Sequence, residues 1–131
     1  MSYKKEVFFL VGPTCTGKSK IAIELLKKHP FELISMDAST VYKNLNVGTD
    51  KPHKKILEKY HHHMIDIIEP NEPFNVNYYC KTVESIVDRI ISKGKIPLFV
   101  GGTMMYFNRL LEGIDLLPER DSNEREFIKY L

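Results

Sequence analysis

The stretch that decides the fold is GPTCTGKS, residues 12–19. It follows an apolar run rich in strand-forming residues, VFFLV at 7–11, and precedes a segment whose apolar residues recur at helical spacing from Ile21 to Leu26. A strand, a glycine-rich loop with the spacing G-x-x-x-x-G-K-S and a helix form the context of a phosphate-binding loop. The sequence therefore predicts that residues 12–19 hold phosphate groups.

Each part of this loop has a physical role. Glycine lets the backbone approach a ligand closely, and the amides at a helix start carry partial positive charge. Lysine adds a full charge, and a serine hydroxyl suits Mg²⁺, for which we expect Ser19 to be a ligand. A glycine-rich turn that binds nothing is the alternative, which the complete pattern disfavours. The predicted diphosphate- or nucleotide-binding residues are Gly12, Pro13, Thr14, Cys15, Thr16, Gly17, Lys18 and Ser19.

Length and composition indicate one globular domain. The chain has 131 residues, of which 43% are hydrophobic and 27% charged. No apolar run approaches the length that crosses a bilayer, so we expect no membrane partner. The net charge of +2 neither requires nor excludes a nucleic-acid partner. Two cysteines are too few for a disulfide framework, which favours a reducing, cytoplasmic setting.

The predicted elements alternate along the chain, which favours an α/β fold with a mostly parallel sheet flanked by helices. A further helix from 123 is still running where the chain stops, so we expect this chain to be the N-terminal part of a longer protein. The predicted strands are 6–11, 31–35, 64–68 and 97–100, and the predicted helices are 17–28, 52–60, 76–92 and 103–111.

Two stretches outside the loop carry candidate site residues. Asp37 follows the second predicted strand, at the edge where ligands bind in open α/β sheets. It is a candidate general base, with a helix cap and a ribose-binding group as the alternatives. Gly101, Gly102 and Thr103 follow the fourth strand, where many nucleotide hydrolases have a magnesium-binding Asp. This pair of glycines predicts a second cluster of backbone N–H donors, with a tight turn as the alternative.

Two further features have a weaker link to function. Adjacent side chains point in different directions, so His61, His62 and His63 are expected to pack and hydrogen-bond rather than to share one metal ion. Cys15 lies among loop amides near a helix start, which favours its thiolate.

Four stretches together resemble one family, the tRNA dimethylallyltransferases (tRNA isopentenyltransferases). They are GPTCTGKS at 12–19, ISMDASTVYKNLNVGTDKP at 34–52, HHMIDIIEPNEPFNV at 62–76 and PLFVGGTMMYFNRLLEGIDLLP at 97–118. Their order and spacing match throughout and cover nearly the whole chain. Members of this family have a P-loop NTPase-like core similar to that of nucleoside kinases. They transfer a dimethylallyl group from its diphosphate to the exocyclic amine of the adenosine next to the tRNA anticodon.

The resemblance implies a role for each candidate residue. The loop binds dimethylallyl diphosphate with Mg²⁺ at Ser19, Asp37 is the general base, and Thr103 contacts the substrate adenosine. The partners are dimethylallyl diphosphate and the anticodon stem-loop of tRNA. The residues that fall on tRNA contacts of the family are Asp37, Ala38, Ser39, Thr40, Thr103 and Arg125.

The chain departs from the family pattern in composition and in length. Ala38 stands where the family usually has Ser, Thr40 where it often has Gln, and Cys15 where it usually has Ala. We expect residues 1–120 to be the catalytic core and 121–131 the start of a helical tRNA-binding insertion. Family members are expected to be monomers, whereas this fragment could self-associate. Two other functions stay open: a nucleoside-kinase-like phosphotransferase, and a fragment that binds diphosphate without catalysis.

Overall fold

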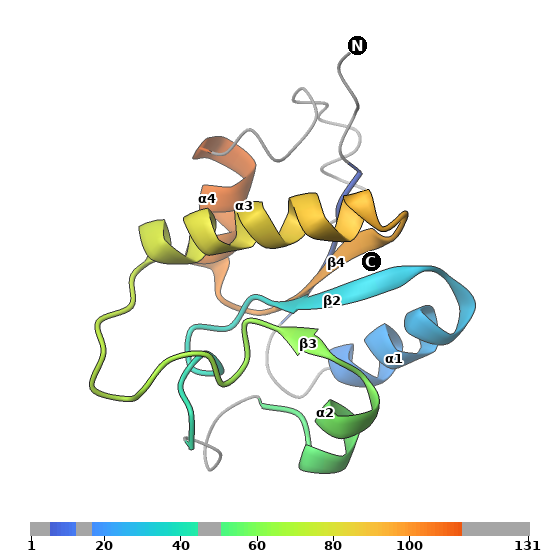
Figure 1. Ribbon diagram of the computed structural model, residues 1–131, viewed down its shortest axis with the longest axis horizontal. Coiled ribbons are helices and arrows are strands. Elements are labelled where there is room, and N and C mark those ends of the chain that lie inside the picture. The colour runs from blue at the N-terminus through green and yellow to red at the C-terminus, as the bar shows by residue number, and fades with distance from the viewer. Residues whose placement is uncertain (1–5, 13–16, 45–50, 114–131) are drawn as a thin grey trace.

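A parallel sheet lies at the centre of the computed structural model, which describes residues 6–12, 17–44 and 51–113 (Figure 1). The strand order in this part of the chain is β1-β4-β2-β3, and every pair of neighbours is parallel. The strands are β1 (Phe8–Val11), β2 (Phe31–Ser35), β3 (His62–His63) and β4 (Ile96–Gly101). The helices are α1 (Lys18–Lys28), α2 (Lys54–Lys59), α3 (Val76–Ser92) and α4 (Met104–Gly113).

The predicted α/β fold is confirmed, and most element bounds agree with the predicted ones within two residues. The strand at 31–35 and the helix at 76–92 have the bounds that the sequence predicted. The helix expected from 123, the segment 121–131 and Arg125 lie outside the described residues. Among the residues that are described, no helix is both long and apolar enough to cross a membrane.

The prediction of a third strand at residues 64–68 is wrong. The strand is only His62–His63, and the backbone then takes left-handed conformations at Met64 (φ 68°) and Asp66 (φ 56°), which interrupt an extended run. The N–H groups of residues 66–68 donate to carbonyls of the loop after β2; that of Asp66, for example, donates to the Thr40 carbonyl at 3.0 Å. Within 64–68, only Ile68 makes a strand-like bridge, to Tyr42.

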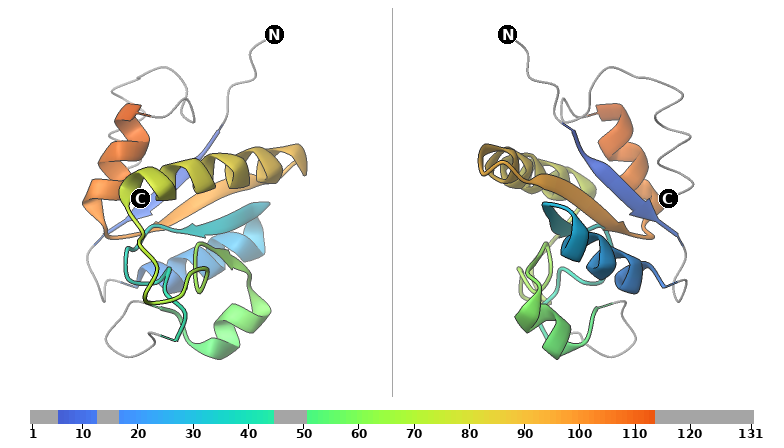
Figure 2. Two further views of the ribbon diagram at one scale, coloured as in Figure 1. Left: turned by 60° about the vertical axis from the view of Figure 1, so that its left-hand side comes forward. Right: turned by 90° about the vertical axis from the view of Figure 1, so that its right-hand side faces the viewer.

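The two faces of the sheet are covered differently, and strand alternation decides which residue faces which helix. Phe9, Ile34 and Phe99 are in register and belong to a large core with α3 and α4. Their neighbours Leu10, Leu33 and Leu98 belong to a small core that includes Ala22 of α1. Figure 2 shows α3 and α4 on one side of the sheet and α1 on the other.

Helix α3, which the sequence predicted at 76–92, carries an apolar stripe on its buried face. Its buried residues recur every three or four positions, as on one face of a helix. The Asn75 side chain caps the start by accepting the Tyr78 N–H at 2.9 Å. At the end, Gly94 takes a left-handed φ of 77° and donates to the Ile91 carbonyl at 2.9 Å. The buried members of the stripe are Tyr79, Cys80, Val83, Ile86, Val87 and Ile90.

Candidate functional site

The carboxyl ends of β1, β2 and β4 meet at one edge of the sheet. Gly12 N–H donates to the Gly101 carbonyl at 3.4 Å, and Thr103 N–H donates to the Met36 carbonyl at 3.4 Å. A Cβ on Gly101 would lie 2.6 Å from the backbone of Met36, and one on Gly102 would lie 2.8 Å from the Gly12 oxygen. Any side chain at either position would therefore push these strand ends apart, which explains the paired glycines.

The described part of the phosphate loop leads into helix α1. Gly17 has a left-handed φ of 82° and precedes the first helical residue, Lys18. The Lys18 ammonium donates to the Gly12 carbonyl, which links the two ends of the loop. Ser19 is exposed on the first turn. Of the predicted loop residues, Pro13, Thr14, Cys15 and Thr16 lie outside the described residues.

Asp37 and Thr103 lie together, although they are far apart in the sequence. Gly102 N–H donates to Asp37 Oδ1 at 2.7 Å, and Ala38 N–H donates to Thr103 Oγ1 at 3.0 Å. The start of α4 therefore orients both the carboxylate and the residue that follows it. Because Thr103 Oγ1 accepts a hydrogen bond from Ala38, its own hydroxyl hydrogen points elsewhere.

The predicted cluster of backbone donors at Gly101-Gly102-Thr103 needs correction. The Gly102 N–H is directed to Asp37 and the Thr103 N–H to the Met36 carbonyl. A donor that already has an acceptor within the chain does not add to an anion site. These amides hold the site together rather than forming a second phosphate-binding cluster.

The residues Ala38, Ser39 and Thr40 of the predicted tRNA-contacting segment differ in how exposed their side chains are. Ser39 is exposed and Ala38 is half-buried. Thr40 is only 1% exposed, and its hydroxyl donates to the Asp37 carbonyl at 2.9 Å. The Thr40 side chain therefore lies behind the site, within the protein.

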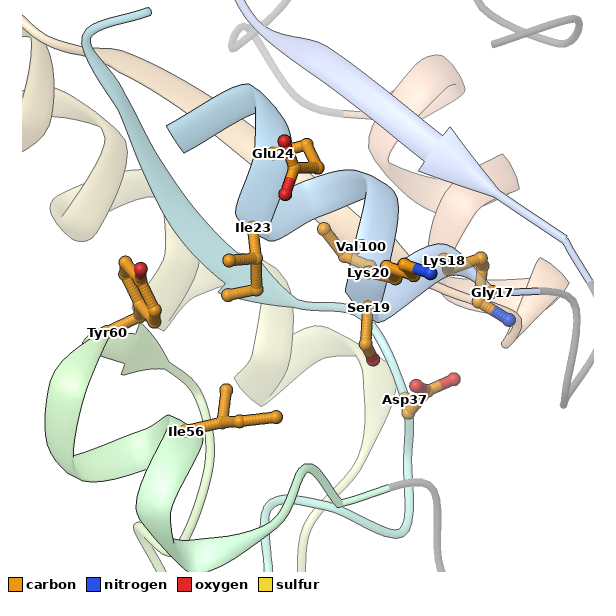
Figure 3. A pocket seen from close by; sticks show the side chains of 10 residues that line it. All are labelled: Gly17, Lys18, Ser19, Lys20, Ile23, Glu24, Asp37, Ile56, Tyr60 and Val100. Carbon is orange, nitrogen blue, oxygen red and sulfur yellow. The ribbon is translucent and has the colours of Figure 1, made fainter. Parts of the chain in front are cut away.

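A cavity of about 530 Å³ joins the loop to Asp37 (Figure 3). One wall is polar, with Lys18 and Ser19 from the start of α1 and Asp37 after β2. The other wall is largely apolar and includes Ile56 of α2 and Tyr60 just after it, which the sequence did not indicate because nothing in their spacing marks them. The cavity is lined by Gly17, Lys18, Ser19, Lys20, Ile23, Glu24, Asp37, Ile56, Tyr60 and Val100.

Of the three adjacent histidines, His62 and His63 have different hydrogen-bond partners, and the His61 ring packs edge-to-face on that of His63 with centroids 4.5 Å apart. His63 Nε2 lies 2.8 Å from Glu32 Oε2, and His62 Nδ1 lies 2.7 Å from the Tyr60 carbonyl. Burial lowers the pKa of both rings, although these hydrogen bonds oppose the shift. Within the described ranges, no group of three or more His, Cys, Asp or Glu side chains could hold a metal ion. Hydrogen bonding and packing, as predicted, account for both of these rings.

Fold and site together define a class: a parallel α/β protein of the P-loop type, with a lysine at the loop and a carboxylate beside it on the polar wall of the cavity. Two family models match the chain, one described as IPP transferase over residues 40–130 and one as isopentenyl transferase over residues 5–71. The chain belongs to the IPP transferase family, as the resemblance implied.

Relatives and solved structures agree with this assignment. The tRNA dimethylallyltransferase of Buchnera aphidicola is 46% identical over 129 residues, which are 98% of this chain and 41% of the relative. That of Legionella pneumophila strain Corby is 46% identical over 122 residues, which are 93% and 39% of the two chains. The tRNA isopentenylpyrophosphate transferase structure from Bacillus halodurans has a TM-score of 0.79 at 32% identity, over 97% of this chain and 42% of the other. The chain thus spans about two fifths of the relatives it matches.

Proposed function

We propose that the protein containing this chain transfers a dimethylallyl group from dimethylallyl diphosphate to the exocyclic amine of an adenosine next to the tRNA anticodon, in the cytoplasm. The observation that carries the proposal is one cavity with Lys18 and Ser19 on its polar wall, Asp37 beside them and an apolar wall opposite. A diphosphate with a short hydrocarbon tail has the same division into a charged and an apolar part. Family membership supports the choice of donor and acceptor.

The donor diphosphate binds at the start of α1. The N–H groups of the first turn and the Lys18 ammonium stabilise negative charge, which grows on the diphosphate as the allylic C–O bond breaks. The hydrocarbon tail lies along Ile23, Ile56 and Val100, where it loses contact with water.

The residues present fit a magnesium ion. Its preferred ligands are oxygen atoms, and the exposed Ser19 hydroxyl on the first turn of α1 supplies one beside the diphosphate position. When bound, Mg²⁺ neutralises part of the charge on the leaving diphosphate.

Asp37 accepts the proton that the adenosine amine loses as its nitrogen bonds to the allylic carbon. The Gly102 N–H holds Oδ1 in place, so the carboxylate is already oriented to accept the proton. The Thr103 hydroxyl, which is already fixed by Ala38 N–H, contacts the adenosine. The exposed Ser39, its neighbour Ala38 and, outside the described residues, Arg125 contact the tRNA.

The test separates donor binding from proton transfer in the intact protein. Asp37→Asn keeps the size of the side chain but removes the base, so transfer should fall roughly 10²–10⁴-fold while pyrophosphate binding by calorimetry is unchanged. Lys18→Ala should instead weaken pyrophosphate binding, since it removes a charge-assisted contact of roughly 1.5–3 kcal/mol.

The opposite pattern would contradict the assignment. If Asp37→Asn abolishes pyrophosphate binding and spares the chemical step, then Asp37 serves the donor or the metal. If the intact protein transfers phosphate from ATP to a small acceptor and no prenyl group to tRNA, it is a phosphotransferase. If it binds pyrophosphate and catalyses neither reaction, the site is a binding site only.

A further inference from the structure

A buried hydroxyl network lies directly behind Asp37 and has no part in the reaction proposed above. Thr40 Oγ1 lies 2.8 Å from Ser35 Oγ and 2.9 Å from the Asp37 carbonyl oxygen. Thr40 is 1% exposed and Ser35 is 6% exposed. A polar group buried to this extent costs stability unless it is hydrogen-bonded, so these contacts are a built feature of the turn.

The direction of the network follows from the number of hydrogens. The Thr40 hydroxyl has one hydrogen, which it donates to the Asp37 carbonyl, because a carbonyl can only accept. The Ser35 hydroxyl must then be the donor to Thr40 Oγ1. The Ser35 carbonyl is fixed in turn by the hydroxyl of the fully buried Tyr79, which donates to it at 2.7 Å. Burial raises the pKa of Tyr79 well above its usual range, so this donor keeps its proton.

The network holds the backbone carbonyl of Asp37, and neither Ser35 nor Thr40 lines the cavity. Thr40 binds the Asp37 carbonyl twice, through its hydroxyl at 2.9 Å and through its own N–H at 3.3 Å. On the other side, Gly102 N–H holds the Asp37 carboxylate. The direction of the carboxylate therefore depends both on a contact at the backbone and on a contact at the side chain.

We infer that Thr40, oriented by Ser35, is a positioning residue that sets the direction of the Asp37 carboxylate. This inference rests on the role proposed for Asp37 as the base. Thr40 acts through the Asp37 backbone and touches neither donor nor acceptor. Its place in the turn, rather than a contact with tRNA, is the reason for a small hydroxyl residue at this position.

Two substitutions separate the hydroxyl of Thr40 from its shape. Thr40→Val keeps the branched volume and removes the hydroxyl, whereas Thr40→Ser keeps the hydroxyl and removes a methyl group. Thr82→Val is the matched control, because the Thr82 hydroxyl also donates to a backbone carbonyl, that of Tyr78 at 2.9 Å, on the exposed side of α3.

The first readout is the transfer rate of the intact protein. Thr40→Val should lower kcat roughly 10- to 100-fold with pyrophosphate affinity unchanged, since a small misplacement of a reacting group is costly. Thr40→Ser should restore most of the rate, and Thr82→Val should match the parent. A Thr40→Val protein with the parental kcat would overturn the inference, and so would a Thr40→Ser protein as slow as Thr40→Val.

The second readout needs no catalysis and keeps this inference separate from the proposed function. Amide exchange at Gly102 reports the hydrogen bond to Asp37 Oδ1, 65 residues away from Asp37 in sequence. Thr40→Val should speed exchange at Gly102 and leave the Val87 amide in the middle of α3 unchanged; Thr40→Ser should not. If prenyl transfer is absent but Gly102 responds in this way, the proposed function fails while Thr40 still positions Asp37. An unchanged Gly102, or equal acceleration at Val87, would contradict the inference.

Discussion

The two faces of the sheet are built for different purposes. Among the described residues, the face under α3 and α4 is closed by a cluster of fifteen buried residues, in which Phe9 stacks on Phe99 with ring centroids 4.8 Å apart. In the same part of the chain, the face under α1 has a buried cluster of four residues, and next to it lies the cavity of about 530 Å³. Both faces are made by neighbouring residues of the same three strands.

This difference shows how one sheet combines stability with access for a ligand. Closely packed apolar side chains contribute most of the free energy of folding, but they leave no space for a substrate. With the closed face supplying that energy, the other face can keep half-buried apolar residues along an open cavity. Substitutions on the two faces should therefore separate stability from binding.

The largest effect on stability is expected when an isoleucine is replaced by alanine on each face in turn. Ile90 is fully buried on the closed face, whereas Ile23 is partly buried and lines the cavity. Ile90→Ala should lower the free energy of unfolding by about 2–5 kcal/mol, and Ile23→Ala should lower it by about 1 kcal/mol. Urea unfolding of both variants measures the difference. Equal losses would show that the open face contributes as much to stability as the closed one.

A smaller effect is expected from the ion cluster at the border of the closed face. Glu32 points to the same side of the sheet as Ile34 and accepts hydrogen bonds from Lys93 at 2.9 Å and His63 at 2.8 Å. Burial by itself would raise the pKa of Glu32, but these two partners lower it to about 2. The charged form is therefore more favoured in the folded state than in the unfolded chain, whose carboxyl has a pKa near 4.5.

The pH dependence follows from this sign. The contribution of Glu32 is fully present above about pH 4.5 and is lost as the pH falls from there towards 2. Glu32→Gln should cost about 1 kcal/mol or less at pH 7, and the difference from the parent should shrink between pH 4.5 and 3. Glu69→Gln, at a more exposed pair with Lys43, is the control. A difference in unfolding free energy between Glu32→Gln and the parent that stays constant with pH would exclude this account of Glu32.

The smallest expected effect is on chemical reactivity and involves no loss of stability. Cys80 is buried on the closed face, and burial raises its pKa, so its thiolate is rare near neutral pH. Cys15 belongs to the phosphate loop, for which the sequence predicts the more reactive thiol. An alkylating reagent followed by peptide mapping should label Cys15 first, and pyrophosphate should slow that labelling. Faster labelling of Cys80 than of Cys15 would contradict this prediction.

Much of the fold was predictable because its causes are local in the sequence. The stripe of α3 and the strand at 31–35 follow from periodicity, which depends on residues only a few positions apart. The start of α1 at Lys18, at the end of the predicted loop, follows from spacing in the same way. Asp37 was predicted from its place after a strand, since parallel strands bring their carboxyl ends to one edge.

Other features were decided by contacts between distant segments. The strand expected at 64–68 did not form, because the N–H groups of residues 66–68 bind the loop after β2 instead. The cavity wall from Ile56 and Tyr60 depends on where α2 lies relative to α1, which the spacing of those residues does not indicate.

The sequence by itself determined the alternation of strands and helices and the family, and it predicts the phosphate loop. The tertiary structure alone decided that Thr40 is buried behind Asp37 and that Gly102 N–H binds its carboxylate at 2.7 Å. The physical reason is the range of the interactions. Periodicity and motif spacing are properties of neighbouring residues, whereas the direction of a carboxylate depends on hydrogen bonds between residues that only the folded chain brings together.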